Sequence, residues 1–343
     1  MRKIFGILSF AFMLFVGVSC EKEDYLHEPN SNVIKFGASS TRAEVKTAAD
    51  ILEFGVCAEM NLGPDGTAEA LEWFPIFEND RISRPNAESD FTYEQVRYWL
   101  DYRSYHFFAV YPYPASVART SEDIMTDGEK TGTKFTYNVP ITIPASADND
   151  IMTAYKSEVT TDSCPSSVDM EFEHKLAKIN FNIKSDQNDH KYTITEVSFR
   201  GVSRTGTLTY TLSLGTNPDT TETITANAEN RNVRRRNLSV TLDTDGEDIF
   251  TNDGGLLVLP QQFSTGQVKL QISYKYQQID NNGDPTSDVE NLTASVDVPA
   301  ITWLSGNSYM YNLTLKNDDR LYISTPTVAP WGSPQSGGII IIK

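Results

Sequence analysis

Apolar and polar residues alternate at every second position along most of this chain. The clearest alternating runs cover residues 135–143, 177–183, 268–276, 292–298 and 309–315. Successive side chains of a β-strand point to opposite faces of its sheet, so each run predicts a strand with one buried and one solvated face. This pattern is typical of antiparallel sheets that pack on one side only.

Polar stretches that favour turns separate these runs, at residues 61–66, 186–189, 243–248 and 281–284. Helical periodicity is weak, and only residues 93–100 could form a short helix or, alternatively, a strand. Many short strands at regular spacing predict β-sandwiches, and 343 residues accommodate two sandwiches better than one. We place the boundary between them near residues 160–170, where a Thr-, Ser- and Pro-rich stretch interrupts the alternation.

The N-terminus carries the features of a secretory signal. Arg2 and Lys3 precede a 15-residue apolar run, which is too short to cross a bilayer and is followed by Ser19 and Cys20. Residues 17–20 look like a loose lipobox and predict cleavage after residue 19 and acylation of Cys20. An ordinary signal peptide followed by a chance cysteine is the alternative. A lipid on Cys20 would anchor the chain to a membrane surface without a spanning helix.

Composition narrows the class of protein. The chain has 29 Lys+Arg against 46 Asp+Glu, a net charge of −17, which argues against nucleic-acid binding. At 39% hydrophobic and 11% aromatic residues it is too apolar for a disordered chain. With four His and three Cys it has little material for a metal cluster or a disulfide framework. Cys57 and Cys164 could pair, or stay as two small buried thiols.

No catalytic constellation emerges from the motifs. Asp280, Asn282 and Asp284 superficially resemble a calcium loop, but Pro285 replaces the required glycine, so we predict a hairpin tip. His106 and His174 each lie in an apolar, strand-like run and are predicted to be packed. The sequence therefore predicts no enzyme activity, no bound metal and no cofactor.

One basic cluster stands out in this acidic chain. It consists of Arg231, Arg234, Arg235 and Arg236. We predict a solvated loop, with an inter-subunit contact or a protease-sensitive loop as alternatives.

Several short segments stand out in order along the chain. They are Trp99 with residues 105–112 (YHFFAVYP), residues 150–154 (DIMTA), residues 172–179 (FEHKLAKI), residues 256–261 (LLVLPQ), and Trp303, Gly306, Tyr309 and Tyr311. Together and in this order they resemble the fimbrillin family of the Bacteroidota, the lipoprotein precursors of type V pili. Lys22-Glu23-Asp24 also resembles the surface-export signal of lipoproteins from these bacteria. Thr153 departs from the tyrosine of the family pattern.

The resemblance implies an all-β chain with two tandem transthyretin-like Greek-key β-sandwich domains. They would cover residues 43–165 and 166–343, after a signal peptide (1–19) and a lipidated propeptide (20–42). It also implies assembly by donor-strand exchange. The precursor's own first strand fills a groove, an extracellular Arg-specific protease removes that strand, and the C-terminal strand of a neighbouring subunit replaces it.

This chain has residues to match each part of that scheme. Val33, Ile34 and Phe36 would form the displaced strand, and cleavage would fall between Arg42 and Ala43. The donor strand would lie within about residues 321–343, with these side chains: Leu321, Ile323, Val328, Trp331, Ile339, Ile340, Ile341 and Ile342. Four consecutive isoleucines invite aggregation unless a groove covers them. The alternative is that this tail completes its own domain.

The predicted function is therefore a structural pilin-type subunit of a fimbrium that supports cell adhesion. Its partners would be other pilin subunits joined head-to-tail, an acyl (palmitate) anchor in the outer membrane, and an Arg-specific protease. Stalk, anchor and tip positions stay open, although Arg42 and the long tail favour a stalk. The main alternative is a surface glycan-binding lipoprotein of a nutrient-uptake system, for which Trp73 and Tyr113 could supply an aromatic platform.

Overall fold

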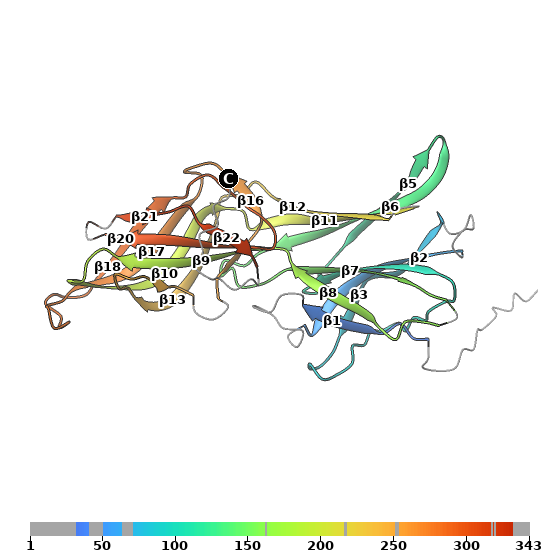
Figure 1. Cartoon of the computed structure of the whole chain (residues 1–343), viewed down its shortest axis with the longest axis horizontal. Helices are drawn as coiled ribbons and strands as arrows, with labels where there is room; N and C mark the ends of the chain where they lie inside the picture. Colours follow the sequence, from blue (N-terminus) through green and yellow to red (C-terminus); the bar gives the residue numbers. More distant parts are fainter. Residues whose placement is uncertain are drawn as a thin grey trace, which may run out of the picture.

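The computed structural model describes residues 32–40, 51–63, 71–161, 163–215, 218–250, 254–316, 318 and 320–331. Within these ranges the regular structure is β-strand, which confirms the all-β prediction, and none of them contains a helix able to cross a bilayer. Residues 93–100 are extended, irregular chain rather than the short helix or strand expected, because their backbone bonds to isolated partners such as Asn32 and Ile34. Figure 1 shows an elongated molecule with two lobes.

The first lobe is built on a six-stranded sheet. Its order is β1 (Phe36–Ser40), β8 (Val168–His174), β7 (Met152–Val159), β4 (Ser104–Tyr111), β2 (Glu53–Asn61) and β3 (Trp73–Ser83). All neighbours are antiparallel except β1 and β8, which are parallel. The sheet curls, because Phe36 on one edge strand lies 5.4 Å, ring to ring, from Phe77 on the other edge strand.

A four-stranded middle sheet packs on the opposite face of the first sheet. Its order is β12 (Asp219–Ala226), β11 (Thr205–Gly215), β6 (Glu129–Thr142) and β5 (Ala118–Thr126). Phe108 of β4 stacks on Tyr210 of β11 with ring centroids 4.2 Å apart. Strands β2 and β4 are therefore buried on both faces, which explains why their side chains are buried at successive positions rather than at every second one.

Two further sheets form the second lobe. One has the order β13 (Arg231–Thr241), β10 (His190–Val202), β17 (Lys269–Gln278) and β18 (Glu290–Asp297). The other has the order β14 (Glu247–Asp248), β9 (Ala177–Ser185), β20 (Asn307–Leu315) and β21 (Leu321–Ile323), with β15 (Leu256–Val258) also on β9 and β22 (Thr327–Pro330) also on β20. Strands β9 and β20 are parallel, and β16 (Gln261–Phe263) pairs with β19 (Ile301–Trp303).

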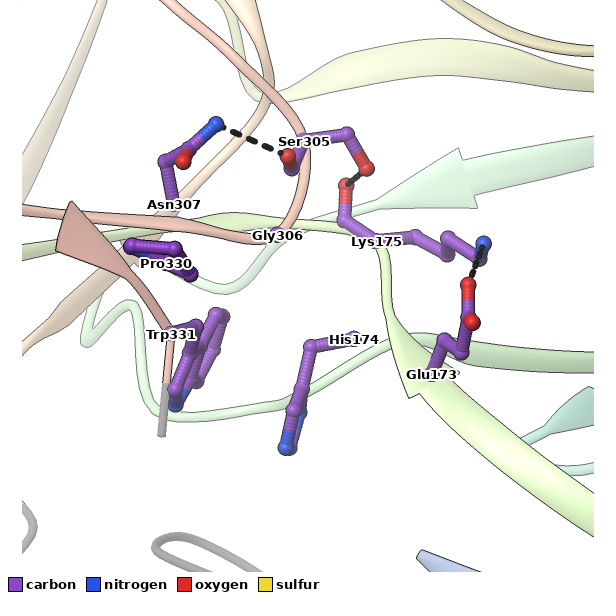
Figure 2. Close-up of a pocket in the computed structure, with 8 residues that line it drawn as sticks. All are labelled: Glu173, His174, Lys175, Ser305, Gly306, Asn307, Pro330 and Trp331. Atoms are coloured by element: carbon purple, nitrogen blue, oxygen red, sulfur yellow. Dashed lines mark hydrogen bonds and ion pairs between the residues drawn. The ribbon is translucent and has the colours of Figure 1, made fainter. Parts of the chain in front are cut away.

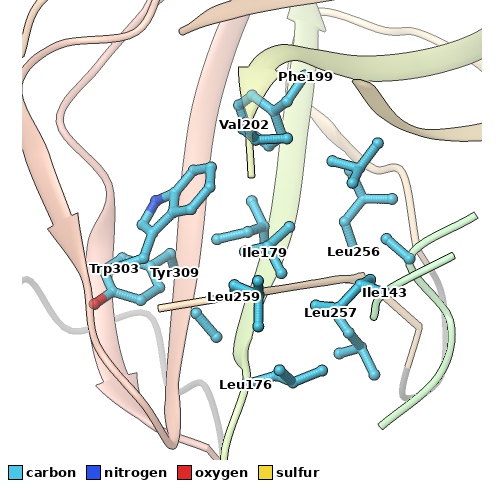
Figure 3. Close-up of a cluster of buried hydrophobic side chains, with 14 of the residues drawn as sticks. Ile143, Leu176, Ile179, Phe199, Val202, Leu256, Leu257, Leu259, Trp303 and Tyr309 are labelled. Carbon is cyan, nitrogen blue, oxygen red and sulfur yellow. The ribbon is translucent and has the colours of Figure 1, made fainter. Parts of the chain in front are cut away.

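The motif segments at residues 256–261 and 303–311 lie in the second lobe, whereas those at residues 105–112 and 150–154 lie in the first lobe. Residues 256–259 are buried, and Trp303 is fully buried with its Nε1–H donating to the Tyr311 hydroxyl at 3.1 Å. Figure 3 shows Ile179 of β9, Leu256 of β15 and Trp303 of β19 around this core. The hydrophobic cluster continues through the middle sheet to the first lobe. The buried residues of these motifs therefore serve to fill the hydrophobic core.

Strand pairing groups the chain differently from the proposed domain limits. β8 begins at Val168, beyond the boundary placed at residue 165, yet it bonds to β7 and β1 of the first sheet. The middle sheet combines β5 and β6 with β11 and β12, which follow that boundary. The division into two domains and the position of the boundary therefore stay a proposal.

Two expectations about single residues are now answered. Cys57 and Cys164 are free thiols, the first buried and the second half-buried.

The arginine cluster is not a loop: Arg231, Arg234, Arg235 and Arg236 belong to strand β13. Arg235 faces inward, where its guanidinium donates to the Gly255 carbonyl at 3.1 Å and lies over the Phe250 ring. A strand tolerates it because the charged group bonds to a backbone oxygen while its stem packs.

Candidate functional site: the first strand and the C-terminal strands

The first described segment is held by backbone bonds on two sides. Val33 forms an antiparallel bridge with Tyr98, and the Ile34 N–H donates to the Arg97 carbonyl at 2.9 Å. Strand β1 then runs parallel to β8, and the Val168 N–H donates to the Lys35 carbonyl at 2.7 Å. Backbone contacts therefore hold this segment on both of its edges, to residues 97 and 98 on one side and to β8 on the other. A strand inserted between two neighbouring strands is held in the same way.

Alternate side chains of this segment enter the first-lobe core. Ile34 is 1% exposed and Phe36 is 7% exposed, whereas Lys35 between them faces solvent. The Phe36 ring makes edge-on contacts with four rings, of Phe54, Phe77, Tyr93 and Phe107, at centroid distances of 6.2, 5.4, 5.9 and 5.9 Å. Such pairs each add roughly 0.5–1.5 kcal/mol beyond the burial of area. Phe36 is the anchor of the segment.

Residues 93–99, which we call the clamp, pair through their backbone with residues 32–34, just ahead of β1. The Tyr93 hydroxyl donates to the Ile34 carbonyl at 2.7 Å, and burial raises the pKa of that phenol. Arg97 ties the clamp to β3, because its guanidinium pairs with Asp80 at 3.1 Å and lies 4.4 Å from the Phe77 ring centre. The clamp thus joins the two edges of the curled sheet across β1.

The predicted processing residues lie outside the described residues. This applies to Cys20, Arg42 and Ala43, and to Ile339, Ile340, Ile341 and Ile342. Strand β1 ends at Ser40, two residues before Arg42.

The described part of the predicted donor segment lies in the second lobe. Leu321 and Ile323 lie on β21, which pairs with residues 313–315 of β20, and Val328 lies on β22, opposite Tyr309. Leu321 is buried, and Ile323 and Val328 are half-buried against the core. Residues 321–331 of this chain thus complete their own sheet, and their role as a donor strand stays a prediction.

Trp331 ends this segment between the two lobes, in a site that we call the socket and that includes His174, Asp150 and Gly306. The backbone N–H of Trp331 donates to the Gly306 carbonyl at 2.8 Å, and its ring is stacked on His174 with centroids 4.2 Å apart and planes 9° apart. The His174 Nδ1 lies 2.5 Å from a carboxylate oxygen of Asp150, and both side chains are buried. Figure 2 shows the stacked rings beside the turn that carries Gly306. The socket borders a cavity of about 350 Å³.

The socket depends on a glycine. Gly306 has a φ of +67°, and a Cβ at this position would lie 3.3 Å from the His174 carbonyl oxygen. A side chain here would strain the turn and press on the connection between the lobes. Trp303 and Gly306, which the sequence singled out for their spacing, therefore belong to one packed unit with Trp331.

A buried carboxylate, that of Glu59, joins two sheets of the core. Glu59 of β2 is fully buried, and its carboxylate bonds to Arg119 of β5 at 2.5 Å and to the Tyr137 hydroxyl of β6 at 3.0 Å. Burial raises the pKa of Glu59. The group joins the first sheet to the middle sheet, and a paired buried carboxylate of this kind holds two sheets in register.

Two other residues with reactive side chains, Cys57 and His106, carry no charge at neutral pH. Burial raises the pKa of the Cys57 thiol to about 12 and lowers the pKa of His106 to about 4. Cys57 is therefore a thiol rather than a nucleophilic thiolate, and His106 is neutral. His106 and His174 are both buried, as expected for packed residues.

The described residues contain no group of three or more His, Cys, Asp or Glu that could hold a metal ion. At residues 280–284 the Asp280 carboxylate accepts the N–H groups of Asn282 and Asp284 at 2.8 and 2.9 Å, which lowers its pKa. The hairpin tip is confirmed. The aromatic residues considered for a glycan platform are half-buried: Trp73 packs edge-on against His106 and Tyr113 lies near Arg81.

The sequence missed the parts of the site that arise from tertiary contact. Tyr93, Arg97 and Asp150 received no role, since single polar residues leave no periodic signal. Asp150 and His174 do fall within two motif segments, and their joint presence was the available hint of a buried pair.

Comparisons with known proteins agree with these features. A fimbrillin-like family model matches residues 41–331, which include every strand from β2 to β22. A fimbrial protein from Bacteroides vulgatus is 16% identical, with a TM-score of 0.58, over 88% of this chain and 99% of its own. A candidate cell adhesion protein from Bacteroides ovatus is 14% identical, with a TM-score of 0.47, over 88% and 97%. The curated proteins contain no match. Because the family model matches well over half of its residues, this chain belongs to the fimbrillin-like family.

Proposed function

We propose that this chain is a structural pilin-type subunit of a type V fimbria. It is exported as a lipoprotein acylated on Cys20, displayed at the outer-membrane surface, and polymerised by donor-strand exchange after cleavage at Arg42. The observation that carries the proposal is the seating of Ile34 and Phe36 between β8 and the clamp, at the seam of a curled sheet. The filament would support cell adhesion.

Strand β1 is short and lies where the two edges of the curled first sheet meet, which we call the seam. Such a strand is suited to replacement by another strand. Five residues of β1 pair with β8, and cleavage after Arg42 would leave them attached by non-covalent contacts alone. Loss of the strand would uncover the rings of Phe54, Phe77 and Phe107, an apolar surface that needs a new occupant. A strand from a neighbour would supply both ladder hydrogen bonds and side chains for these pockets.

The tail beyond Trp331 has the length and composition for that role. Residues 332–343 would reach roughly 40 Å when extended, and they end in four isoleucines and a lysine. In a strand, two of those isoleucines would face the groove, where Ile34 and Phe36 sat. Since residues 321–331 complete their own sheet, we assign the donor to residues 332–343 and keep Trp331 as its fixed base.

The experiment is protease-triggered assembly of the purified full chain. Treatment with an Arg-specific protease should produce SDS-resistant ladders, because a strand bound along a groove dissociates very slowly. Arg42→Ala and a deletion of residues 332–343 should each abolish the ladders. Arg231→Ala, which removes another exposed arginine, is the matched control and should leave them intact. Ladders that persist in both test variants would overturn the proposal.

A further inference from the structure

The outer face of the β13–β10–β17–β18 sheet gathers positive charge. Inward side chains such as Tyr192, Phe199 and Leu270 fill the core, and the alternate positions face solvent. Six bases occupy this outer face: Lys191, Arg200, Arg234, Arg236, Lys269 and Lys275. Only two acids, Glu196 and Asp297, share it. We call this surface the basic face, and it reverses the charge balance of a chain with net charge −17.

Four of these bases have no acidic partner among the residues that the structure describes. Glu196 pairs with Arg236 at 3.0 Å and Asp297 pairs with Lys269 at 2.5 Å, so both acids of the face are already neutralised. Lys191, Arg200, Arg234 and Lys275 are left without an ion pair. An anionic partner from outside would therefore meet uncompensated positive charge.

The strand register places like charges together. Arg200 lies directly opposite Lys269, and Arg234, opposite Ser198, is the diagonal neighbour of Arg200. Like charges directly opposite each other destabilise a sheet. Asp297 compensates Lys269 alone, so the fold gains no ion pair from Arg200 or Arg234, and this unpaired charge points to a use outside the fold.

The complementary surface lies at one end of the same lobe. The loops at residues 186–189, 242–248 and 279–289 contain nine exposed acids and no lysine or arginine. Backbone hydrogen bonds join them, from Ser185 N–H to the Asp243 carbonyl (2.7 Å) and from Ile279 N–H to the Asp189 carbonyl (3.1 Å). We call these loops the acidic pole, whose hairpin between β17 and β18 marks the far left of Figure 1.

We propose that the basic face is a lateral docking surface for the acidic pole of a second copy of this chain. The unpaired Arg200 and Arg234 lie at the opposite end of β10 from Lys191, roughly 30 Å along the strand, so the acidic pole of the same chain cannot neutralise them. Because face and pole are different patches, the contact is heterologous, and each added copy presents a further face and pole. It needs neither Arg42 cleavage nor strand exchange.

The charge distribution gives this contact a distinctive salt dependence. Near 0.01 M salt the Debye length is about 30 Å, so the repulsion between two chains of net charge −17 acts over whole molecules. At about 0.15 M it falls to about 8 Å, and facing patches then dominate. At about 1 M it is about 3 Å, and the patches are screened as well. Association is therefore strongest at intermediate salt.

The test uses the full chain with Arg42→Ala, so that strand exchange cannot contribute. Sedimentation velocity at about 0.01, 0.15 and 1 M salt should show association with its maximum at the middle value. Adding Arg200→Glu and Arg234→Glu should weaken it at least about tenfold, since like charges would then face the pole. Asp243→Lys with Asp245→Lys should weaken it equally, and mixing the two variants should restore a mixed complex.

Matched controls separate this contact from general charge effects. Lys134→Glu with Lys156→Glu makes the same change of charge on other strands and should leave association unchanged. Arg200→Lys with Arg234→Lys keeps the charge and should also associate normally, and circular dichroism confirms folding of each variant. Absence of association at intermediate salt, or failure of the mixed variants to associate, would overturn the proposal. So would binding of dextran sulfate, but not dextran, at the basic face of a chain that stays monomeric.

Discussion

Replacement of Phe36 by alanine tests whether one side chain anchors the first strand. Phe36 is 7% exposed and contacts four aromatic rings at centroid distances from 5.4 to 6.2 Å. Phe→Ala changes in packed cores cost about 3–5 kcal/mol. Because the substituted strand stays in place but leaves a void among rigid rings, we expect a loss of stability within that range.

The same change should act on strand release once the chain is cut. A loss of about 3 kcal/mol corresponds to more than a hundredfold in an equilibrium constant. Since effects on related complexes appear mainly in dissociation rates, the cleaved peptide that contains residues 32–40 should leave about a hundredfold faster. Ladders should therefore form sooner from Phe36→Ala wherever strand release limits assembly.

Two assays separate these effects. Urea unfolding in the Arg42→Ala background measures stability, with the buried Trp99 of the first lobe as the nearest fluorescent reporter. Mass spectrometry after a protease pulse measures peptide release. Ser39→Ala, an exposed change on the same strand, is the control and should change neither value. A stability loss below about 1 kcal/mol together with an unchanged release rate would refute the anchoring role of Phe36.

Three further predictions concern the clamp and the buried polar groups. Tyr93→Phe removes the hydrogen bond to the Ile34 carbonyl and should cost about 0.5–1.5 kcal/mol, measured by the same urea unfolding, with no loss if water replaces the bond. Arg119→Ala leaves the Glu59 carboxylate buried without its cation and should cost about 3–5 kcal/mol, whereas Glu59→Leu with Arg119→Met should recover most of that loss; equal losses in both variants would contradict the pairing argument. His106 has a pKa of about 4 in the folded chain, below the ordinary 6.5, so the unfolded chain binds its proton first as pH falls. Stability should therefore drop between pH 6.5 and 4 by up to about 3 kcal/mol, and His106→Gln should flatten that part of the profile.

The positions of strands were predictable from the sequence where one face of the sheet is exposed to solvent. The alternating runs at 135–143, 177–183 and 309–315 fall on β6, β9 and β20, because burial of one face imposes a period of two on the sequence. Strand β4 could be found only as a continuous apolar run, since both of its faces are covered.

Pairing between distant segments was not predictable. The parallel contact of β1 with β8 joins residues more than 130 positions apart, and no local pattern records it. The arginines of β13 suggested a loop because their charge obscured the alternation with Val233. Trp331 was predicted to lie in a donor strand because it continues the alternating segment that starts at Leu321, whereas its burial depends on the end of β8 and on the turn at Gly306.

The socket of Trp331 also determines how tension passes through the molecule. Any pull on the chain beyond Trp331 acts first on a ring stacked against His174, at the point where the chain crosses from β8 to β9. Force is thereby divided between the two lobes instead of peeling β22 from β20. A subunit stretched from this end would therefore resist through both of its lobes.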